Sequence, residues 1–273
     1  LTERDHPTIP LARQAELLGI SRSSLYYQPV PMSQAEIDLT NLVDRIYTAY
    51  PFYGNRRIKT ELEKNHQLIV SRTHVRKLTT ILGLETIYPR PKDHSSDPDG
   101  QHKKYPYLLT GLTIDHPNQV WGTDITYIKL NQGFCYLAAL MDWFSRYVVA
   151  WELSATLEID FVLSNLQQAV KVAVPELHNS DQGSHFTSPQ YMSILDEHGV
   201  RISMDGRGRC MDNIFTERLW RTVKYENVYL KSYADLAEAR AGLTEYFDFY
   251  NRRRFHTSLN NLTPAAVYFN QNN

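Results

Sequence analysis

Three carboxylates, Asp124, Asp181 and Glu217, are the residues of this chain whose types and spacing best suit catalysis. Thirty-five residues separate Asp181 from Glu217, and Asp124 lies upstream of both. Carboxylate oxygens are hard ligands that suit Mg²⁺ or Mn²⁺. Two such ions can activate an attacking oxygen and stabilise the leaving oxygen of a displacement at phosphorus. The three residues therefore suggest a metal site for phosphoryl transfer.

The two aspartates lie where the sequence predicts β-strands. Residues 120–130, which contain Asp124, are rich in β-branched and aromatic side chains, and an Asp is disfavoured there unless it has a function. Asp181 follows the short segment 176–180 at the expected exit of another strand. Strand ends are where α/β folds place reactive groups, so this position favours a catalytic role.

Glu217 lies on a predicted helix. Apolar residues recur at helical spacing along residues 212–226 and leave Glu217 on a different face, so the helix can bring it to Asp124 and Asp181. The alternative is that all three carboxylates are structural, at a strand edge, in a turn and on a solvated helix face.

The neighbouring acidic residues receive other roles. Asp142 is expected to close a turn between strands, and Asp212 to cap the following helix. Asp205 precedes a glycine-containing loop in which Arg207 and Arg209 could meet DNA phosphates. A mobile active-site loop is one interpretation of this segment, and a plain surface connection is the other.

Arg221 and Lys224 stand four and seven residues beyond Glu217, so α-helical periodicity puts all three on one face. Two cations there would hold DNA phosphates beside the scissile bond. The alternative is an ordinary Glu–Arg surface pair. A further basic cluster after a later helix either extends this surface or caps that helix. It comprises Arg252, Arg253, Arg254 and His256.

The elements that must position these residues predict an α/β fold. Consecutive hairpin strands followed by alternating helix and strand give a mixed sheet flanked by helices. The expected strands are residues 120–130, 134–142 and 147–153. Helices are expected at residues 160–173 and 233–251. A further helix is expected to begin with Ser188 as its N-cap and Pro189 in its first turn.

The amino-terminal region contains two helix-turn-helix patterns. In the first, residues 11–18 look like a supporting helix and residues 21–27, which include Arg22, look like a recognition helix after Gly19. Such a recognition helix would bring Arg22 to DNA. The alternative is a solvated helical hairpin with an ordinary basic face.

The second pattern pairs residues 56–64 with residues 71–82 and leaves Arg72 and Lys77 facing outward. Residues 53–92 contain nine Lys or Arg and three Glu, although the whole chain has a net charge of −1. A basic amino-terminal region joined to an acidic core is expected if one part holds DNA and the other binds metal ions.

Composition is typical of an intracellular globular protein. The 273 residues can bury one substantial core and a smaller module, and 42% of them are hydrophobic. No apolar run approaches the roughly 20 residues of a membrane-spanning helix. Cys135 and Cys210 are far apart and have no zinc-site spacing. The expected location is the cytoplasm, with no membrane contact.

Six segments in order resemble the integrase-core transposases of bacterial insertion elements, specifically the catalytic product of the second reading frame, a family related to retroviral integrases. The segments are residues 120–127, 141–146, 179–188, 204–209, 212–226 and 249–259. The resemblance spans nearly the whole chain, although the zinc module of retroviral integrases has no counterpart. It implies a ribonuclease-H-like core with an Asp-Asp-Glu triad at Asp124, Asp181 and Glu217.

The resemblance also implies a domain organisation and partners. We expect a helix-turn-helix region at 1–87, a linker at 88–117, the catalytic core at 118–230 and a helical extension at 231–273. Two Mg²⁺ or Mn²⁺ ions, element terminal repeats, target DNA and a homo-oligomer on DNA are the implied partners. An upstream-frame protein or fusion before Leu1 is compatible with the family.

Two other functions compete with transposition. A nuclease of the same fold would cut DNA without joining it, and a regulator would bind DNA with the core as a scaffold only. The intact Asp124, Asp181 and Glu217 count against the regulator.

Overall fold

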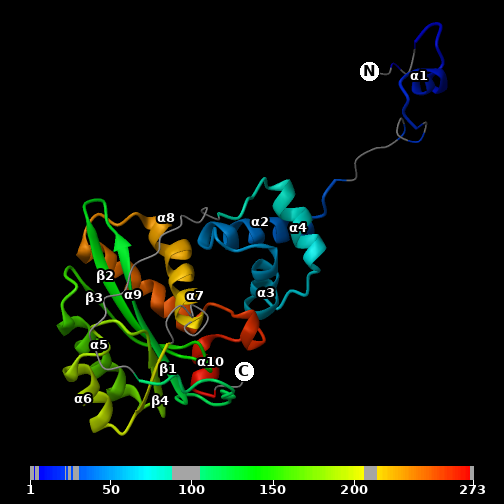
Figure 1. The fold of residues 1–273 in the computed structure, drawn as a ribbon. Coiled ribbons are helices and arrows are strands. Elements are labelled where there is room, and N and C mark those ends of the chain that lie inside the picture. Colours follow the sequence, from blue (N-terminus) through cyan, green and yellow to red (C-terminus); the bar gives the residue numbers. More distant parts are fainter. Residues whose placement is uncertain are drawn as a thin grey trace.

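The computed structural model describes residues 3, 6–21, 23, 26, 31–87, 105–205 and 214–270 (Figure 1). Several sequence predictions fall outside these residues. They are the DNA contacts of Arg22, Arg207 and Arg209, the cap at Asp212, most of the recognition helix at 21–27 and residues 88–104 of the linker at 88–117.

A five-stranded mixed sheet forms the centre of the larger part of the structure. Its strands are β1 (Val120–Lys129), β2 (Phe134–Asp142), β3 (Val148–Ser154), β4 (Leu177–Ser180) and β5 (Arg201–Met204). The order is β3-β2-β1-β4-β5, with β1, β2 and β3 antiparallel and with β4 parallel to both β1 and β5. The predicted mixed sheet is confirmed, and the first three strands match their predicted bounds within one residue.

Helices cover both faces of this sheet. On one face, α5 (Ile159–Val172) and α6 (Pro189–Glu197) pack over Trp121 and Leu140. On the other face lie α7 (Ile214–Val223), the π-helix η2 (Lys224–Val228), α8 (Tyr229–Lys231) and α9 (Leu236–Arg252). The buried residues of α7 and α9 join those of β1 and β2 in a second hydrophobic cluster. The chain then forms η3 (Thr257–Leu259) and α10 (Pro264–Tyr268).

The amino-terminal helices are α1 (Leu11–Leu17), α2 (Gln34–Ala49), α3 (Asn55–Asn65) and α4 (Arg72–Ile81). Helices α2, α3 and α4 pack around Val43, Leu62 and Leu78, each of which is fully buried. This cluster is continuous with the core beneath the sheet, because Tyr50 stacks on Phe249 of α9 at a ring-centroid distance of 5.1 Å. Helices α2, α3 and α4 therefore rest on the larger part of the molecule (Figure 1).

Local sequence signals set the helix starts. Ser188 caps α6 by accepting a hydrogen bond from the backbone of Tyr191, with Pro189 in the first turn, and Ser71 caps α4 in the same way. The predicted cap at Ser188 is confirmed. Within the part of the chain that the structure describes, none of the helices combines the length and hydrophobicity needed to cross a bilayer.

Candidate active site

Asp124 lies in β1 just beyond the point where its parallel neighbour ends. Strand β4 pairs only with residues 120–122 of β1, so the carboxylate stands at the exit of β4. One carboxylate oxygen accepts the backbone N–H of Ile125 at 2.8 Å, and the other accepts the indole N–H of Trp220 from α7 at 2.9 Å. Strand β1 and helix α7 together therefore fix the orientation of this side chain.

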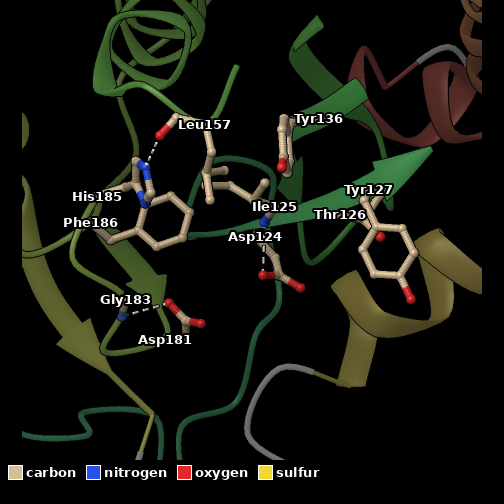
Figure 2. Close-up of a pocket in the computed structure, with 10 residues that line it drawn as sticks. All are labelled: Asp124, Ile125, Thr126, Tyr127, Tyr136, Leu157, Asp181, Gly183, His185 and Phe186. Carbon is tan, nitrogen blue, oxygen red and sulfur yellow. Dashed lines mark hydrogen bonds between the residues drawn. The ribbon is translucent and has the colours of Figure 1, made fainter. Parts of the chain in front are cut away.

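Asp181 immediately follows β4, as predicted, and its carboxylate points toward the same space as that of Asp124 (Figure 2). Its Oδ1 accepts the backbone N–H of Gly183 at 2.9 Å. A Cβ atom at Gly183 would lie 2.8 Å from this oxygen, so a side chain there would displace the carboxylate of Asp181. Both aspartates line a pocket of about 240 Å³ together with Tyr127, Tyr136 and His185, among others.

The two carboxylates interact electrostatically. Burial first, and then the negative charges of Asp181 and Glu217, raise the pKa of Asp124 to about 7 against the opposing hydrogen bond from Trp220. Desolvation by the surrounding atoms also raises the pKa of Asp181, although the residue stays exposed to the pocket. Like charges brought together in this way favour a bound cation, which would repay their mutual repulsion.

Helix α7 approaches β1 closely because residue 122 is a glycine. A Cβ atom there would collide with the indole of Trp143 and lie 3.0 Å from the hydroxyl of Thr216 on α7. Thr216 is buried, whereas the next residue, Glu217, is exposed. Gly122 therefore lets α7 settle where Trp220 meets Asp124, and no signal in the sequence alone indicated this role.

Glu217 is close enough for its charge to act on Asp124, but it is not one of the residues that line the pocket. Desolvation raises its pKa, and its charge is felt by Asp124. Among the described residues, no three His, Cys, Asp or Glu side chains converge tightly enough to hold a metal ion. The oxygen donors of Asp124 and Asp181 fit a hard cation, and Glu217 is the third ligand that the sequence predicted.

The two cations of the α7 region differ in their surroundings. The ammonium of Lys224 lies 4.6 Å from the ring centroid of Tyr127, and burial lowers the pKa of Lys224 while Asp124 opposes that change. Arg221 is exposed and stacks on Tyr225 at 5.6 Å. Because the α-helix gives way to a π-helix at Lys224, regular α-helical periodicity does not continue beyond this residue.

The cations predicted for α4 are on the surface. Arg72 and Lys77 are exposed, as the helical pattern predicted, while Val75 and Leu78 are fully buried. His74 is partly buried and lies 2.8 Å from Glu36 of α2. The outward face of α4 is therefore available to a polyanion.

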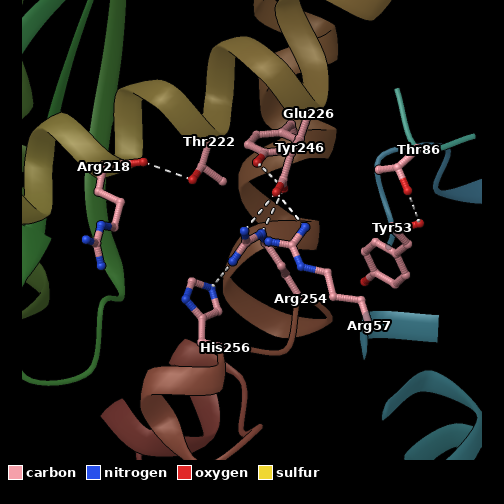
Figure 3. A network of polar contacts seen from close by, with 9 residues as sticks. All are labelled: Tyr53, Arg57, Thr86, Arg218, Thr222, Glu226, Tyr246, Arg254 and His256. Atoms are coloured by element: carbon pink, nitrogen blue, oxygen red, sulfur yellow. Dashed lines mark hydrogen bonds and ion pairs between the residues drawn. The ribbon is translucent and has the colours of Figure 1, made fainter. Parts of the chain in front are cut away.

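A buried polar network was missed by the sequence analysis (Figure 3). Arg254 binds Glu226 of η2 through two hydrogen bonds of 2.8 Å, and Arg57 of α3 binds the same carboxylate at 2.7 Å. Tyr246 of α9 donates a further hydrogen bond at 3.0 Å. Burial disfavours the charged carboxylate, but Arg254 and Arg57 still lower the pKa of Glu226.

This network corrects one interpretation of the basic cluster near the carboxyl end. Arg254 is only 6% exposed and donates a hydrogen bond to Nε2 of His256 at 2.9 Å, so neither extends a DNA-binding surface. Burial, and then the charge of Arg254, lower the pKa of His256 to about 2, which keeps its ring neutral. Arg252 and Arg253 are exposed and lie near Asp248.

Comparisons with known families agree with this architecture. Two models described as integrase core domain match residues 114–210 and 198–264, and a model described as HTH-like domain matches residues 34–92. The HTH-like match covers α2, α3 and α4, and the integrase matches cover the sheet and the helices through η3.

Several relatives match most of the chain, InsK and the IS904 transposase among them. InsK, named as a transposase for insertion sequence element IS150 of Escherichia coli strain K12, is 31% identical over 272 residues, which is 97% of this chain and 94% of InsK. The transposase for insertion sequence element IS904 of Lactococcus lactis is 31% identical over 217 residues, which is 78% of this chain and 85% of that protein.

A solved structure shares the fold. A chain in the cryo-EM structure of the simian T-cell lymphotropic virus intasome in complex with PP2A regulatory subunit B56 gamma aligns with a TM-score of 0.54 at 14% identity. The alignment covers 83% of this chain and 72% of that one. The expected ribonuclease-H-like sheet, preceded by a helical region, is thereby confirmed.

Proposed function

The chain belongs to the insertion-element transposases that carry an integrase core, and we propose that it cleaves the DNA ends of such an element and joins them to target DNA. The proposed catalytic residues are Asp124, Asp181 and Glu217. The observation that carries this proposal is the pair of aspartates that share one pocket, each with a raised pKa. A purely structural pair of carboxylates would gain nothing from this mutual repulsion.

The three carboxylates would hold two divalent metal ions. When bound there, Mg²⁺ or Mn²⁺ would supply the Lewis acidity that lowers the barrier to displacement at phosphorus. Asp124 must release its proton to act as a ligand, since its pKa is raised to about 7. Trp220 holds one oxygen of Asp124 in a fixed orientation, which leaves the carboxylate pre-positioned.

The proposed reaction has two displacements. In cleavage, water bonds to phosphorus at the element end and the bond to the 3′-oxygen breaks, so that oxygen takes up a proton and becomes a 3′-hydroxyl. In joining, this hydroxyl bonds to a phosphorus of the target strand and displaces the target's 3′-oxygen. One phosphodiester bond forms as another breaks, so joining requires no external energy source.

Positively charged side chains would hold the DNA around this site. Lys224 interacts electrostatically with Asp124 and Arg221 is exposed on the preceding turn, so both could contact phosphates near the scissile bond. Arg72 and Lys77 would meet DNA on the exposed face of α4, which belongs to the HTH-like domain. The domain boundaries at residues 87, 117 and 230 remain part of this proposal.

The test uses DNA carrying the element ends found on either side of the gene. Asp124→Asn, Asp181→Asn and Glu217→Gln remove charge with little change of shape, and each should lower cleavage and joining by more than about a hundredfold. Asp196→Asn is the matched control, because Asp196 is exposed on α6. DNA binding by all four variants should stay close to that of the unmodified protein.

Two further measurements complete the test. Activity should disappear in a chelator and return with Mg²⁺ or Mn²⁺, whereas Ca²⁺ should substitute poorly because its coordination is larger and looser. Joined products on a sequencing gel separate a transposase from a nuclease, which would give cleaved ends alone. A triad variant that keeps full activity would remove that residue from the proposed catalytic set.

A further inference from the structure

Three aromatic residues project from one face of the β1–β2 hairpin. Tyr127 is paired with Tyr136 across the two strands, and Phe134 is paired with Lys129, so all four side chains share this face. Tyr127 is 46% exposed and Phe134 is 53% exposed, and their rings meet edge to face at 5.6 Å. We call Tyr127, Phe134 and Tyr136 the aromatic strip.

The aromatic strip is continuous with the candidate active site. Tyr127 and Tyr136 line the pocket that contains Asp124 and Asp181, and both rings stand beside that pocket in Figure 2. Helices α5 and α6 cover this face of the sheet over Trp121 and Leu140, and Phe134 lies beyond them at the end of the hairpin. The strip therefore leads from the carboxylates toward the outer end of the hairpin.

Cations flank the aromatic strip. Lys129 is exposed on the same face, and the ammonium of Lys224 lies 4.6 Å from the ring centroid of Tyr127. Glu152 on the neighbouring strand is balanced by Arg240, which binds it at 2.7 Å. The surface thus combines exposed rings with positive charge, which is the combination that single-stranded nucleic acid requires.

We propose that the aromatic strip binds unpaired bases of a DNA strand that passes the active site, with the rings stacking on bases and the lysines meeting phosphates. This inference rests on the proposed function. A paired duplex hides its base faces, so the strip would act on the DNA end once its terminal pairs have opened. The lysines Lys129 and Lys224 favour a polyanion over a second copy of the chain as the occupant of this surface.

The test is a binding titration of the full chain with two probes in chelator. One probe is an oligodeoxythymidylate, and the other is an abasic oligonucleotide of the same length, which has the same phosphates without bases. Phe134→Ala should weaken binding of the first probe about fivefold or more and leave binding of the second unchanged, since stacking needs a base. Phe134→Trp should keep the affinity for both.

Two variants guard against a loss of folding. Phe134→Leu keeps an apolar contact with Tyr127 and removes the ring, so it should behave like Phe134→Ala while its thermal unfolding matches that of the unmodified protein. Phe269→Ala is the control, because Phe269 is 50% exposed and packs edge-on against Tyr268 in a different part of the molecule. It should leave the binding of both probes unchanged.

Other outcomes would overturn the proposal. If Phe134→Ala weakened binding of both probes equally, Phe134 would act on phosphate binding through its neighbours. If it left binding of both probes unchanged, the aromatic strip would not contact DNA. Weakened self-association with unchanged probe binding would assign the strip to a second copy. Because the titration needs neither metal nor cleavage, its failure is distinguishable from failure of the catalytic proposal, which the triad variants test.

Discussion

Glu226 and Arg254 form a bidentate ion pair that is almost inaccessible to solvent. The side chain of Glu226 is 8% exposed and that of Arg254 is 7% exposed. Glu226 lies in the π-helix that continues α7, and Arg254 follows α9. Arg57 of the amino-terminal helical region binds the same carboxylate. The network therefore connects the helix of Glu217 to two other parts of the chain (Figure 3). The opposite charges of its members compensate for their removal from water.

Removing one member should destabilise the protein strongly. Glu226→Gln leaves the guanidinium of Arg254 buried without a counter-charge, and we expect the free energy of unfolding to fall by about 3–5 kcal/mol. Denaturant unfolding measures this change. Glu245→Gln is the control, because Glu245 pairs with Lys231 in an exposed site where we expect less than about 1 kcal/mol. Equal effects of the two variants would contradict the network's structural importance.

Gly122 should be intolerant of a side chain. Gly122→Ala places a methyl group against Trp143 and Thr216, so α7 must shift away from β1 and the Trp220–Asp124 hydrogen bond should weaken. We expect a loss of stability of roughly 1–3 kcal/mol and a loss of cleavage activity. Gly54→Ala is the control, because its Cβ atom would meet only Thr86 at 3.7 Å. A fully active and stable Gly122→Ala would contradict the positioning role.

Local signals explain what the sequence predicted well. The alternation and β-branched content of residues 120–142 set β1 and β2, and Ser188 with Pro189 set the start of α6. The pairing of Glu226 with Arg57 spans 169 residues, and no local pattern reports such a contact. The role of Gly122 depends on how closely a distant helix packs, which periodicity cannot show. The burial of Arg254 was missed for the same reason.

Asp124 should make stability depend on pH in metal-free protein. Its folded-state pKa is raised from 3.8 to about 7, so the folded state holds the proton more tightly and the free energy of unfolding should fall as pH rises between those values. Asp124→Asn does not titrate. In chelator, the free energy of unfolding of this variant should therefore exceed that of the unmodified protein by on the order of 4 kcal/mol at pH 8 and by little at pH 4. A constant difference across this range would contradict the raised pKa.

Trp220 should shift the pH profile of the reaction through its hydrogen bond to Asp124. Because this bond favours the charged carboxylate, Trp220→Phe should raise the pKa of Asp124 further and move the acid limb of the cleavage profile to higher pH. Activity at pH 6 should fall more than activity at pH 9. Trp151→Phe is the control, since Trp151 stacks on Phe247 away from the pocket. A uniform loss at all pH values would indicate a packing role alone.

The exposed cations of α4 should be separable by their dependence on salt. If Arg72 or Lys77 contacts a phosphate, replacing it by Ala should weaken binding to all duplex sequences alike and reduce the slope of log affinity against log salt by about 1. If it contacts a base edge, the loss should appear with the element ends only, because base contacts confer sequence preference. Gel-shift titrations of the full chain at two salt concentrations, with element-end and random duplexes, distinguish these results.

Lys171→Ala is the control, since Lys171 is exposed on α5 and distant from the HTH-like domain in sequence. Binding that is unchanged by both α4 variants would show that this helix does not meet DNA.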